Sequence, residues 1–403
     1  MNKRDDSLLH EGMRAPPEPP KPCATEFDCV ALVLQGGGAL GAYQAGVYER
    51  LLEAGIAPTW VSGISIGAIN SAIIAGNAPE DRVPRLREFW ELVSTASDGV
   101  LGDQWTAVPL IDTWRAWLNQ LAAGRVLVQG VPGFFEPRLP PPYLAPTGPG
   151  ATSYYDTAPL RATLERLVDF DRINARETRL SIGAVNVRTG NFAYFDNATH
   201  KIGPEHVMAS GALPPGFDSV EIDGERYWDG GMVSNTPLDW VLSSRSGVDT
   251  LVFQVDLWSA RGEVPSDLAS VATRIKEIQY SSRTRSATDA FRRTEKLRSA
   301  FNELLALMPE ELAATPQARL LAQAADPALY NIVQLVYRSS TYEGHFKDFE
   351  FSRRTMNEHW RAGHDDAATT LAHEHIFRAP HPTDNPAVYD FLTAPARPIQ
   401  HSE

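Results

Sequence analysis

The sequence predicts a three-layer α/β fold with a mainly parallel central sheet, followed by a mainly helical C-terminal extension. Two observations support this prediction. Short apolar runs, typical of strands buried on both faces, alternate with segments of helical character over residues 28–265. From about residue 266 onward the pattern becomes mainly helical and charged. Alternating strands and helices pack as helices on both faces of one sheet.

The composition is that of an ordinary globular protein. Of 403 residues, 43% are hydrophobic and 22% are charged, which excludes a mostly disordered, collagenous or coiled-coil chain. The formal net charge of −13 argues against bulk nucleic-acid binding, because neutralising phosphates requires a positive field.

The cysteine content and hydropathy indicate a cytoplasmic protein. The two cysteines, Cys23 and Cys29, are too few to staple this chain and do not have a zinc-site spacing. We therefore expect free thiols in a reducing compartment. No apolar run reaches the roughly 18 residues of a membrane span, and no apolar segment near the N-terminus resembles a secretory signal. Work at a membrane surface stays compatible with these features.

The elements follow in order after a proline-rich tail, residues 1–27, which we expect to be disordered. Apolar runs and turn signals predict strands at 30–34, 59–61, 225–228 and 251–255 and a hairpin of 180–187 with 192–195. Helical spacing predicts helices over 42–54, 66–75 and around 86–93.

A long loop, residues 130–152, interrupts this alternation and is rich in proline and glycine. Long loops in compact enzymes are often lids, so we interpret it as a lid. Aromatic residues lie in or before it and are expected to be mostly core, or to line an acyl tunnel: Trp105, Trp114, Trp117, Phe134 and Phe135. Of these, Phe134 and Phe135 are expected to be partly exposed.

The first candidate motif is the glycine cluster Gly36-Gly37-Gly38, which follows a buried strand and opens a helix. Glycines there can expose successive main-chain amides, and a helix N-terminus adds partial positive charge, so the loop can hold an anion. Gly36-x-Gly38-x-x-Gly41 also matches a dinucleotide-binding pattern. That alternative is weak because no acidic residue lies between Ala54 and Pro79, where the ribose ligand belongs.

The second motif, Gly63-Ile-Ser65-Ile-Gly67, lies between a predicted strand and an apolar helix. This is the context of a nucleophile elbow, in which flanking glycines permit a tight turn that exposes the serine. The alternative interpretation is a helix-capping serine between packing glycines. The strand–turn–helix context favours the nucleophile.

The third motif is Asp229-Gly230-Gly231, after a predicted strand. On its own it indicates a turn. Within hydrogen-bond reach of Ser65, the Asp229 carboxylate could accept the serine proton, and amides of the Gly36–Gly38 loop could stabilise the resulting oxyanion.

Four blocks together resemble the patatin-like phospholipases. They are the glycine run 34–43, the elbow 63–67, the segment 209–214 and the Asp-Gly-Gly segment 229–237, and their order and spacing fit that family over residues 29–258. The resemblance implies a Ser–Asp dyad without histidine, an acyl-serine intermediate and hydrolysis of lipid acyl esters. On the matching positions, Ser65 is the nucleophile, Asp229 the base and Gly36–Gly38 the oxyanion loop. Residues 266–403 resemble the helical extension of many bacterial members. No metal or organic cofactor is implied.

Several alternatives stay open. A Ser–His–Asp hydrolase would need one of the histidines that follow Ser65: His345, His359, His364, His373 and His375. His373 and His375 could instead suggest a metal pair, although surface histidines are favoured. An acyltransferase would use the same acyl-enzyme, and a catalytically silent interaction module would keep only the fold.

A basic stretch, residues 271–300, could bring the protein to anionic lipid at a membrane surface. A solvated helix face, or one that pairs with acidic residues of the chain, is the favoured interpretation. The expected partner is therefore a lipid or other acyl ester, with peripheral membrane contact as a hypothesis.

Overall fold

The computed structural model describes residues 25–94, 122–144, 147, 151–244, 247–324, 328–338, 344 and 346–392. Residues 1–24 of the predicted tail, with Cys23, lie outside the described part, as do Trp105, Trp114 and Trp117. The tail prediction extended too far, because Glu26 donates its main-chain N–H to the carbonyl of Phe377 at 3.0 Å and Phe27 is buried. Cys29 is a buried free thiol.

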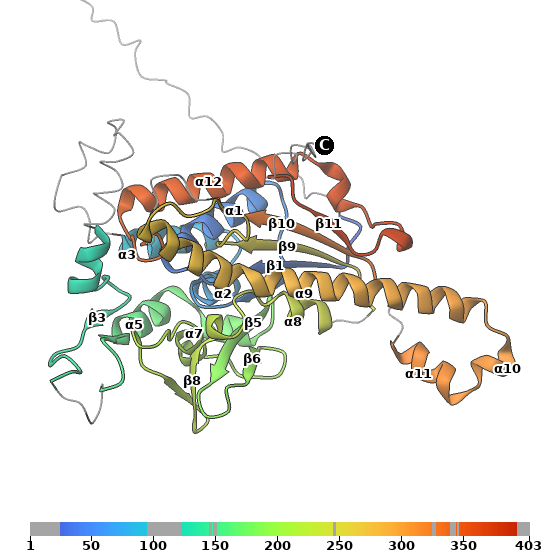
Figure 1. Ribbon diagram of the computed structural model, residues 1–403, viewed down its shortest axis with the longest axis horizontal. Helices are drawn as coiled ribbons and strands as arrows, with labels where there is room; N and C mark the ends of the chain where they lie inside the picture. Colours follow the sequence, from blue (N-terminus) through green and yellow to red (C-terminus); the bar gives the residue numbers. More distant parts are fainter. Residues whose placement is uncertain are drawn as a thin grey trace, which may run out of the picture.

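A nine-stranded, mostly parallel sheet forms the centre of the molecule (Figure 1). Its strands are β1 (Cys29–Leu34), β2 (Trp60–Gly63), β5 (Arg179–Asn186), β6 (Phe192–Asp196), β7 (Val220–Ile222), β8 (Glu225–Asp229), β9 (Thr250–Asp256), β10 (Tyr330–Val336) and β11 (Ala387–Tyr389). The order is β11-β10-β9-β1-β2-β5-β8-β7, with β6 also pairing β5. Pairings from β11 to β5 are parallel, and those of β5 with β6 and β8, and of β7 with β8, are antiparallel. A separate two-stranded sheet pairs β3 (Glu136–Pro137) with β4 (Tyr155–Asp156).

Helices cover both faces of this sheet. The helices of the described part are α1 (Ala42–Glu53), α2 (Ile66–Ala75), α3 (Arg82–Val93), α5 (Ala158–Leu167), α6 (Phe170–Asn174), α7 (Pro204–Ser210), α8 (Leu238–Ser243), α9 (Leu268–Ala306), α10 (Glu310–Ala313), α11 (Pro316–Ala324) and α12 (Arg353–Leu371). Of these, α10 and α11 lie at the end of α9, away from the sheet (Figure 1). In β1, Leu32 and Leu34 join the core formed with α1, α2, α3 and α12, whereas Ala31 and Val33 join a second core with α8. Successive strand residues point to opposite faces, so β1 is buried on both sides. The three-layer prediction is confirmed.

The elements predicted for the N-terminal two thirds are confirmed with shifts of one or two residues at their ends, except that the helix predicted around 86–93 begins four residues earlier, at Arg82. The predicted helix over 66–75 coincides with α2, and the predicted hairpin corresponds to β5 and β6, which pair antiparallel. Of the predicted elements, β1, β2, α2 and β9 are buried throughout, whereas β6 and β8 are only partly buried.

The C-terminal part is mainly helical, as predicted, but it also contributes two strands that the sequence analysis missed. β10 pairs with β9 and β11 with β10, so both extend the central sheet. Asn331 and Gln334 interrupt the apolar pattern of β10. The buried amide of Asn331 is compensated by hydrogen bonds to the carbonyls of Ile376 and Arg378, at 2.7 and 2.9 Å.

A close contact between two glycines fixes α12 on α1. A Cβ atom built on Gly363 would lie 2.0 Å from the carbonyl oxygen of Tyr43, and one on Gly46 would lie 1.9 Å from that of Trp360. The two helix backbones therefore touch where neither residue has a side chain. Figure 1 shows α12 lying across α1 at this face of the sheet.

We predict that Gly363→Ala lowers the free energy of unfolding by about 1–3 kcal/mol, because the added methyl group forces the helix backbones apart. Urea unfolding measures this change. Gly124→Ala is the matched control: Gly124 is helical and has open space where its Cβ would lie, so alanine there should leave stability unchanged or raise it. Equal stability of the wild type and Gly363→Ala would contradict the close packing.

Candidate active site

Ser65 stands at a sharp turn between β2 and α2. Its φ of +56° lies in the left-handed region that non-glycine residues rarely adopt. The turn is held from outside, because the Ser65 main-chain N–H donates to the side-chain oxygen of Ser210 at 2.9 Å. Strain of this kind persists only where the surrounding structure fixes it, and it is common at functional sites.

The flanking glycines are required by close backbone contacts. A Cβ on Gly63 would lie 2.2 Å from the carbonyl oxygen of Gly67, and one on Gly67 would lie 2.3 Å from that of Leu34. The backbone at Gly63 therefore contacts the backbone at Gly67, and Gly67 contacts the end of β1, so neither position has room for a side chain. This geometry matches the predicted strand–turn–helix context of a nucleophile elbow.

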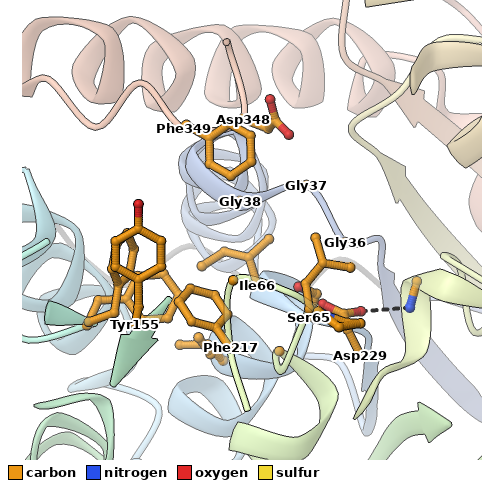
Figure 2. Close-up of a pocket in the computed structure, with 18 of the residues that line it drawn as sticks. Gly36, Gly37, Gly38, Ser65, Ile66, Tyr155, Phe217, Asp229, Asp348 and Phe349 are labelled. Carbon is orange, nitrogen blue, oxygen red and sulfur yellow. Dashed lines mark hydrogen bonds between the residues drawn. The ribbon is translucent and has the colours of Figure 1, made fainter. Parts of the chain in front are cut away.

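Asp229 ends β8 and faces the elbow. β8 pairs with β5, which pairs with β2, and Ala184 of β5 lies opposite Asp229. This pairing brings the carboxylate next to the Ser65 side chain, close enough for the serine to lower the pKa of the carboxyl, although 164 residues separate the two in sequence. Figure 2 shows the two side chains adjacent to each other.

The environment of Asp229 sets its acidity. Only 3% of the residue is exposed, and this burial raises the pKa of the carboxyl to about 6, against lowering contributions from hydrogen bonds with Ser65 and Gly231. The Gly231 main-chain N–H donates to one carboxylate oxygen at 2.7 Å. Gly230 has no room for a side chain, since a Cβ there would lie 2.7 Å from the carbonyl of Gly183.

The three glycines of the loop line the cavity, but their main-chain amides differ in their hydrogen-bond partners. Gly36 donates its main-chain N–H to the carbonyl of Asn235 at 3.1 Å, so in this structure that amide is engaged within the protein, and the oxyanion role of Gly36 stays a prediction. Gly37 and Gly38 open a short 3₁₀ helix, where the first N–H groups lack partners within the helix. Within the described part of the chain, no hydrogen bond from either amide is found.

The side chains of Asn235 and Trp258 both bind the main-chain carbonyl of Gly36. The Asn235 side-chain amide donates to the Gly36 carbonyl at 2.9 Å, and the Trp258 indole N–H donates to the same oxygen at 3.0 Å. A Cβ on Gly36 would lie 2.4 Å from the Asn235 side-chain oxygen. The loop is therefore rigidly placed before any ligand binds.

A cavity of about 230 Å³ opens at Ser65 and is lined mainly by apolar side chains. The glycine loop, Ser65 and Asp229 stand at its polar end (Figure 2). The apolar lining comes from several elements: Ile66, Ile69, Leu127, Phe134, Phe135, Tyr155, Leu213, Pro214, Pro215, Phe217, Trp258, Tyr280, Phe349 and Phe351. Such a site can place the polar reacting group of a ligand at the dyad and its hydrocarbon part in the cavity.

Phe134 and Phe135 were expected to be partly exposed, and this prediction is wrong. Their exposed fractions are 7% and 6%. Both rings pack on Phe217, with centroids 6.0 and 5.1 Å from it, and Phe135 also contacts Tyr155. Both residues belong to the segment 130–152, so the part of that segment next to the cavity is packed against the rest of the protein and lines the cavity.

The histidines named above, apart from His345, and part of the basic stretch lie in the described part of the chain. Among the described residues, those that line the cavity include no histidine. His373 stacks on Phe391 with ring centroids 3.9 Å apart, and the described residues contain no group of three or more His, Cys, Asp and Glu side chains arranged to hold a metal. This agrees with the interpretation of His373 and His375 as surface residues.

Three basic residues of the 271–300 stretch form ion pairs with acidic groups of the chain: Arg274 with Glu277, Lys276 with Asp348 and Arg298 with Glu295. This agrees with the favoured interpretation of that stretch. Among the described helices, none combines the length and the apolar character needed to cross a bilayer.

Sequence reasoning did not identify Ser210, Tyr280, Asp348, Phe349 or Phe351 as part of the site. Ser210 lies within the matched segment 209–214, which offered a signal. The others come from the C-terminal part of the chain, where no local motif marks them and only the folded structure brings them to the cavity.

Comparison with known families gives two matches. A family model described as Patatin-like phospholipase matches residues 32–242, just over half of the chain. A second model, described as Patatin phospholipase, matches residues 278–383 and so covers much of the C-terminal part.

Curated relatives match over short stretches. An uncharacterized NTE family protein of Mycobacterium tuberculosis is 37% identical over 113 residues, which are 27% of this chain and 18% of that protein. Lysophospholipase nte1 of Aspergillus terreus is 53% identical over 55 residues, which are 14% of this chain and 4% of that protein. The chain therefore spans less than a fifth of the length of these relatives.

Solved structures are more distant. VipD from Legionella pneumophila is 16% identical with a TM-score of 0.38, over 86% of this chain and 67% of that one. The ExoU–SpcU complex from the type III secretion system of Pseudomonas aeruginosa gives 18% identity and a TM-score of 0.27, over 68% of this chain and 52% of that one.

We predict that Ser210→Ala lowers the free energy of unfolding by about 1–3 kcal/mol, because the buried Ser65 amide and Gly183 carbonyl both lose their partner. Thermal or urea unfolding measures the loss. Ser243→Ala is the control, since the Ser243 hydroxyl also bonds a main-chain carbonyl but is exposed on α8. Similar small changes for both variants would contradict the support assigned to Ser210.

Proposed function

The chain belongs to the patatin-like phospholipase family, and we propose that it is a lipid acyl-ester hydrolase in which Ser65 is the nucleophile and Asp229 the base. The observation that carries this proposal is the contact between the Ser65 hydroxyl and the buried Asp229 carboxylate at the polar end of an apolar cavity. A serine hydroxyl is weakly acidic, so it needs an adjacent base to become an effective nucleophile.

The first half of the reaction forms an acyl-enzyme. Ser65 Oγ attacks the ester carbonyl carbon while Asp229 takes the hydroxyl proton, and the carbonyl oxygen becomes an oxyanion. The amides of Gly37 and Gly38 are the donors proposed to stabilise it. When the tetrahedral intermediate collapses, the ester C–O bond breaks and the leaving alcohol takes the proton from Asp229.

The second half releases the acid. Water attacks the acyl carbon of the Ser65 ester while Asp229 accepts one of its protons, and the same amides hold the new oxyanion. Collapse breaks the bond to Ser65 Oγ, which recovers its proton from Asp229. The products are a free carboxylic acid and the original enzyme, so no cofactor is consumed. An alcohol acceptor in place of water would make the same acyl-enzyme an acyltransferase.

The cavity supports an aliphatic acyl group as the part of the substrate that the protein buries. Its lining is mostly aromatic and aliphatic, which favours hydrocarbon over polar ligands. The name of the Aspergillus relative, a lysophospholipase, points to the same class of substrate. We therefore propose a lipid substrate, with phospholipids and lysophospholipids as the first esters to test.

Ser65→Ala is expected to reduce hydrolysis of lipid and chromogenic esters by at least about 10³-fold while the protein stays folded, because the acyl-enzyme cannot form. Fatty-acid release and labelling by a fluorophosphonate probe are the measurements. Ser71→Ala, a buried serine on the same helix that does not line the cavity, should keep near wild-type rates. Comparable turnover by Ser65→Ala would refute the assignment.

Asp229→Asn is expected to reduce kcat by about 10²–10⁴-fold, since an amide cannot take the serine proton. Its melting temperature at pH 8 should equal or exceed that of the wild type, because the variant removes a carboxylate whose charged form is opposed by burial. Asp239→Asn, a carboxylate on α8 outside the cavity, is the control and should leave kcat unchanged. A fully active Asp229→Asn would exclude this carboxylate as the base.

The pH dependence of kcat/KM follows from the protonation state in which Asp229 can act as a base. Asp229 acts as a carboxylate, and burial raises its pKa to about 6, so kcat/KM should rise through pH 6 and level off above pH 7. A rate profile from pH 4.5 to 8.5 measures this. Asp256 is another buried carboxyl with a raised pKa, about 7, so Asp256→Asn is the control and should keep the rise near pH 6. A profile that stays flat down to pH 5 would contradict the role of Asp229.

A further inference from the structure

Two ion pairs join α9 to the C-terminal segment 346–351, and they are arranged reciprocally. Lys276 of α9 bonds both carboxylate oxygens of Asp348 at 2.8 Å. The next residue on each side forms the second pair, in which Lys347 bonds Glu277 of α9 at 3.0 Å. Each element therefore contributes one acid and one base, and we call these four residues the ionic clasp.

The ionic clasp is largely removed from solvent. The exposed fractions of the side chains are 2% for Lys347, 14% for Glu277 and 13% for Asp348, and Lys276 is the most exposed at 27%. Burying charges costs desolvation energy that the ion pair only partly recovers, so such pairs contribute little net stability but define one arrangement of the elements they join. This suggests that the clasp serves to fix the position of segment 346–351.

The segment that the clasp holds is pressed against the glycine loop. The Asp348 main-chain carbonyl accepts the N–H of Ala39 at 3.0 Å, immediately after Gly38. A Cβ on Gly38 would lie 2.2 Å from that carbonyl oxygen, and Gly38 has a φ of +56°. Figure 2 shows Asp348 next to Gly38. The segment therefore contacts the loop directly at Gly38, where only a residue without a side chain leaves room for the Asp348 carbonyl.

The second pair reaches the other end of the loop. The Lys347 ammonium lies 5.0 Å from the centre of the Trp258 ring, a cation–π contact, and the Trp258 indole N–H bonds the Gly36 carbonyl. The two ion pairs therefore support the loop on both sides of the amides of Gly37 and Gly38. The Lys276 ammonium also lies 4.7 Å from the ring centre of Phe349, which lines the cavity.

We propose that the ionic clasp positions the oxyanion amides, so that Lys276, Glu277, Lys347 and Asp348 are positioning residues and the C-terminal part completes the active site. This inference rests on the proposed function. Amides that stabilise a transition state must be placed to a fraction of an ångström, and misplacement by about 1 Å can cost about 10²-fold in rate. Loss of the clasp should consequently lower kcat more than it changes KM.

The test compares Lys276→Met, Asp348→Asn and the double variant on a soluble short-chain ester. Each single variant should lower kcat by about 10–100-fold with KM within about threefold of the wild type, and the fluorophosphonate labelling rate of Ser65 should fall in parallel. The double variant should be no slower than the slower of the two single variants, because each substitution removes the same ion pair between Lys276 and Asp348. Lys276→Arg keeps the charge and should retain most of the activity.

Glu295→Gln supplies the matched control for stability. Glu295 is a fully buried acid on the same helix that pairs with Arg298 at 2.7 Å, and it does not line the cavity. Its loss should lower the melting temperature while kcat stays within about twofold of the wild type. The double clasp variant, which leaves no unpaired charge in this pair, should recover stability relative to the single variants without recovering kcat.

Two results would overturn the inference: Lys276→Met with wild-type kcat, or a double variant whose kcat recovers together with its stability. Both are distinct from failure of the proposed function. If instead the proposed function were wrong, the wild type would show no ester turnover, or Ser65→Ala would be as active as the wild type.

Discussion

The contact between Ser65 and the carboxylate of Asp229 depends on nearly every other feature of the core. A carboxylate that is 3% exposed and adjacent to a serine side chain needs two strands, β2 and β8, that end at the same place with only β5 between them. β2 runs parallel to β5 and β8 antiparallel to it, so the turn after one strand meets the end of the other. The sharp turn at Ser65, the two flanking glycines and the Ser210 hydroxyl are all needed to keep the hydroxyl at that point.

Much of the fold and of the site could be predicted from local sequence. Buried strands and apolar helices of the N-terminal part have continuous apolar runs, and the elbow and the Asp-Gly-Gly turn combine glycines with one polar residue at fixed spacing. The hydrogen-bond partner of the Gly36 amide could not be predicted, because it is the carbonyl of Asn235, 199 residues later in the sequence. The exposure of Phe134 and Phe135 likewise depends on Phe217, which reaches them only in the folded chain.

The C-terminal part was harder to predict because its contributions are non-local. β10 contains Asn331 and Gln334, whose polarity hides the strand pattern, and the side-chain NH2 group of Asn331 donates to carbonyls about 45 residues further along. The walls contributed by Tyr280, Phe349 and Phe351 have no motif of their own. A boundary placed at residue 265 divides the sequence by composition, whereas the sheet and the cavity both continue across it.

The position of β10 also bears on how the protein is made. The ribosome completes β9 long before residues 330–336 emerge, so a growing chain that ends between these strands leaves one side of β9 without a hydrogen-bonding neighbour. An unpaired parallel edge next to a fully apolar strand is a template for association with other chains. During biosynthesis, the interval between β9 and β10 is therefore a stage at which the nascent chain carries a sheet edge that its own later residues have yet to cover.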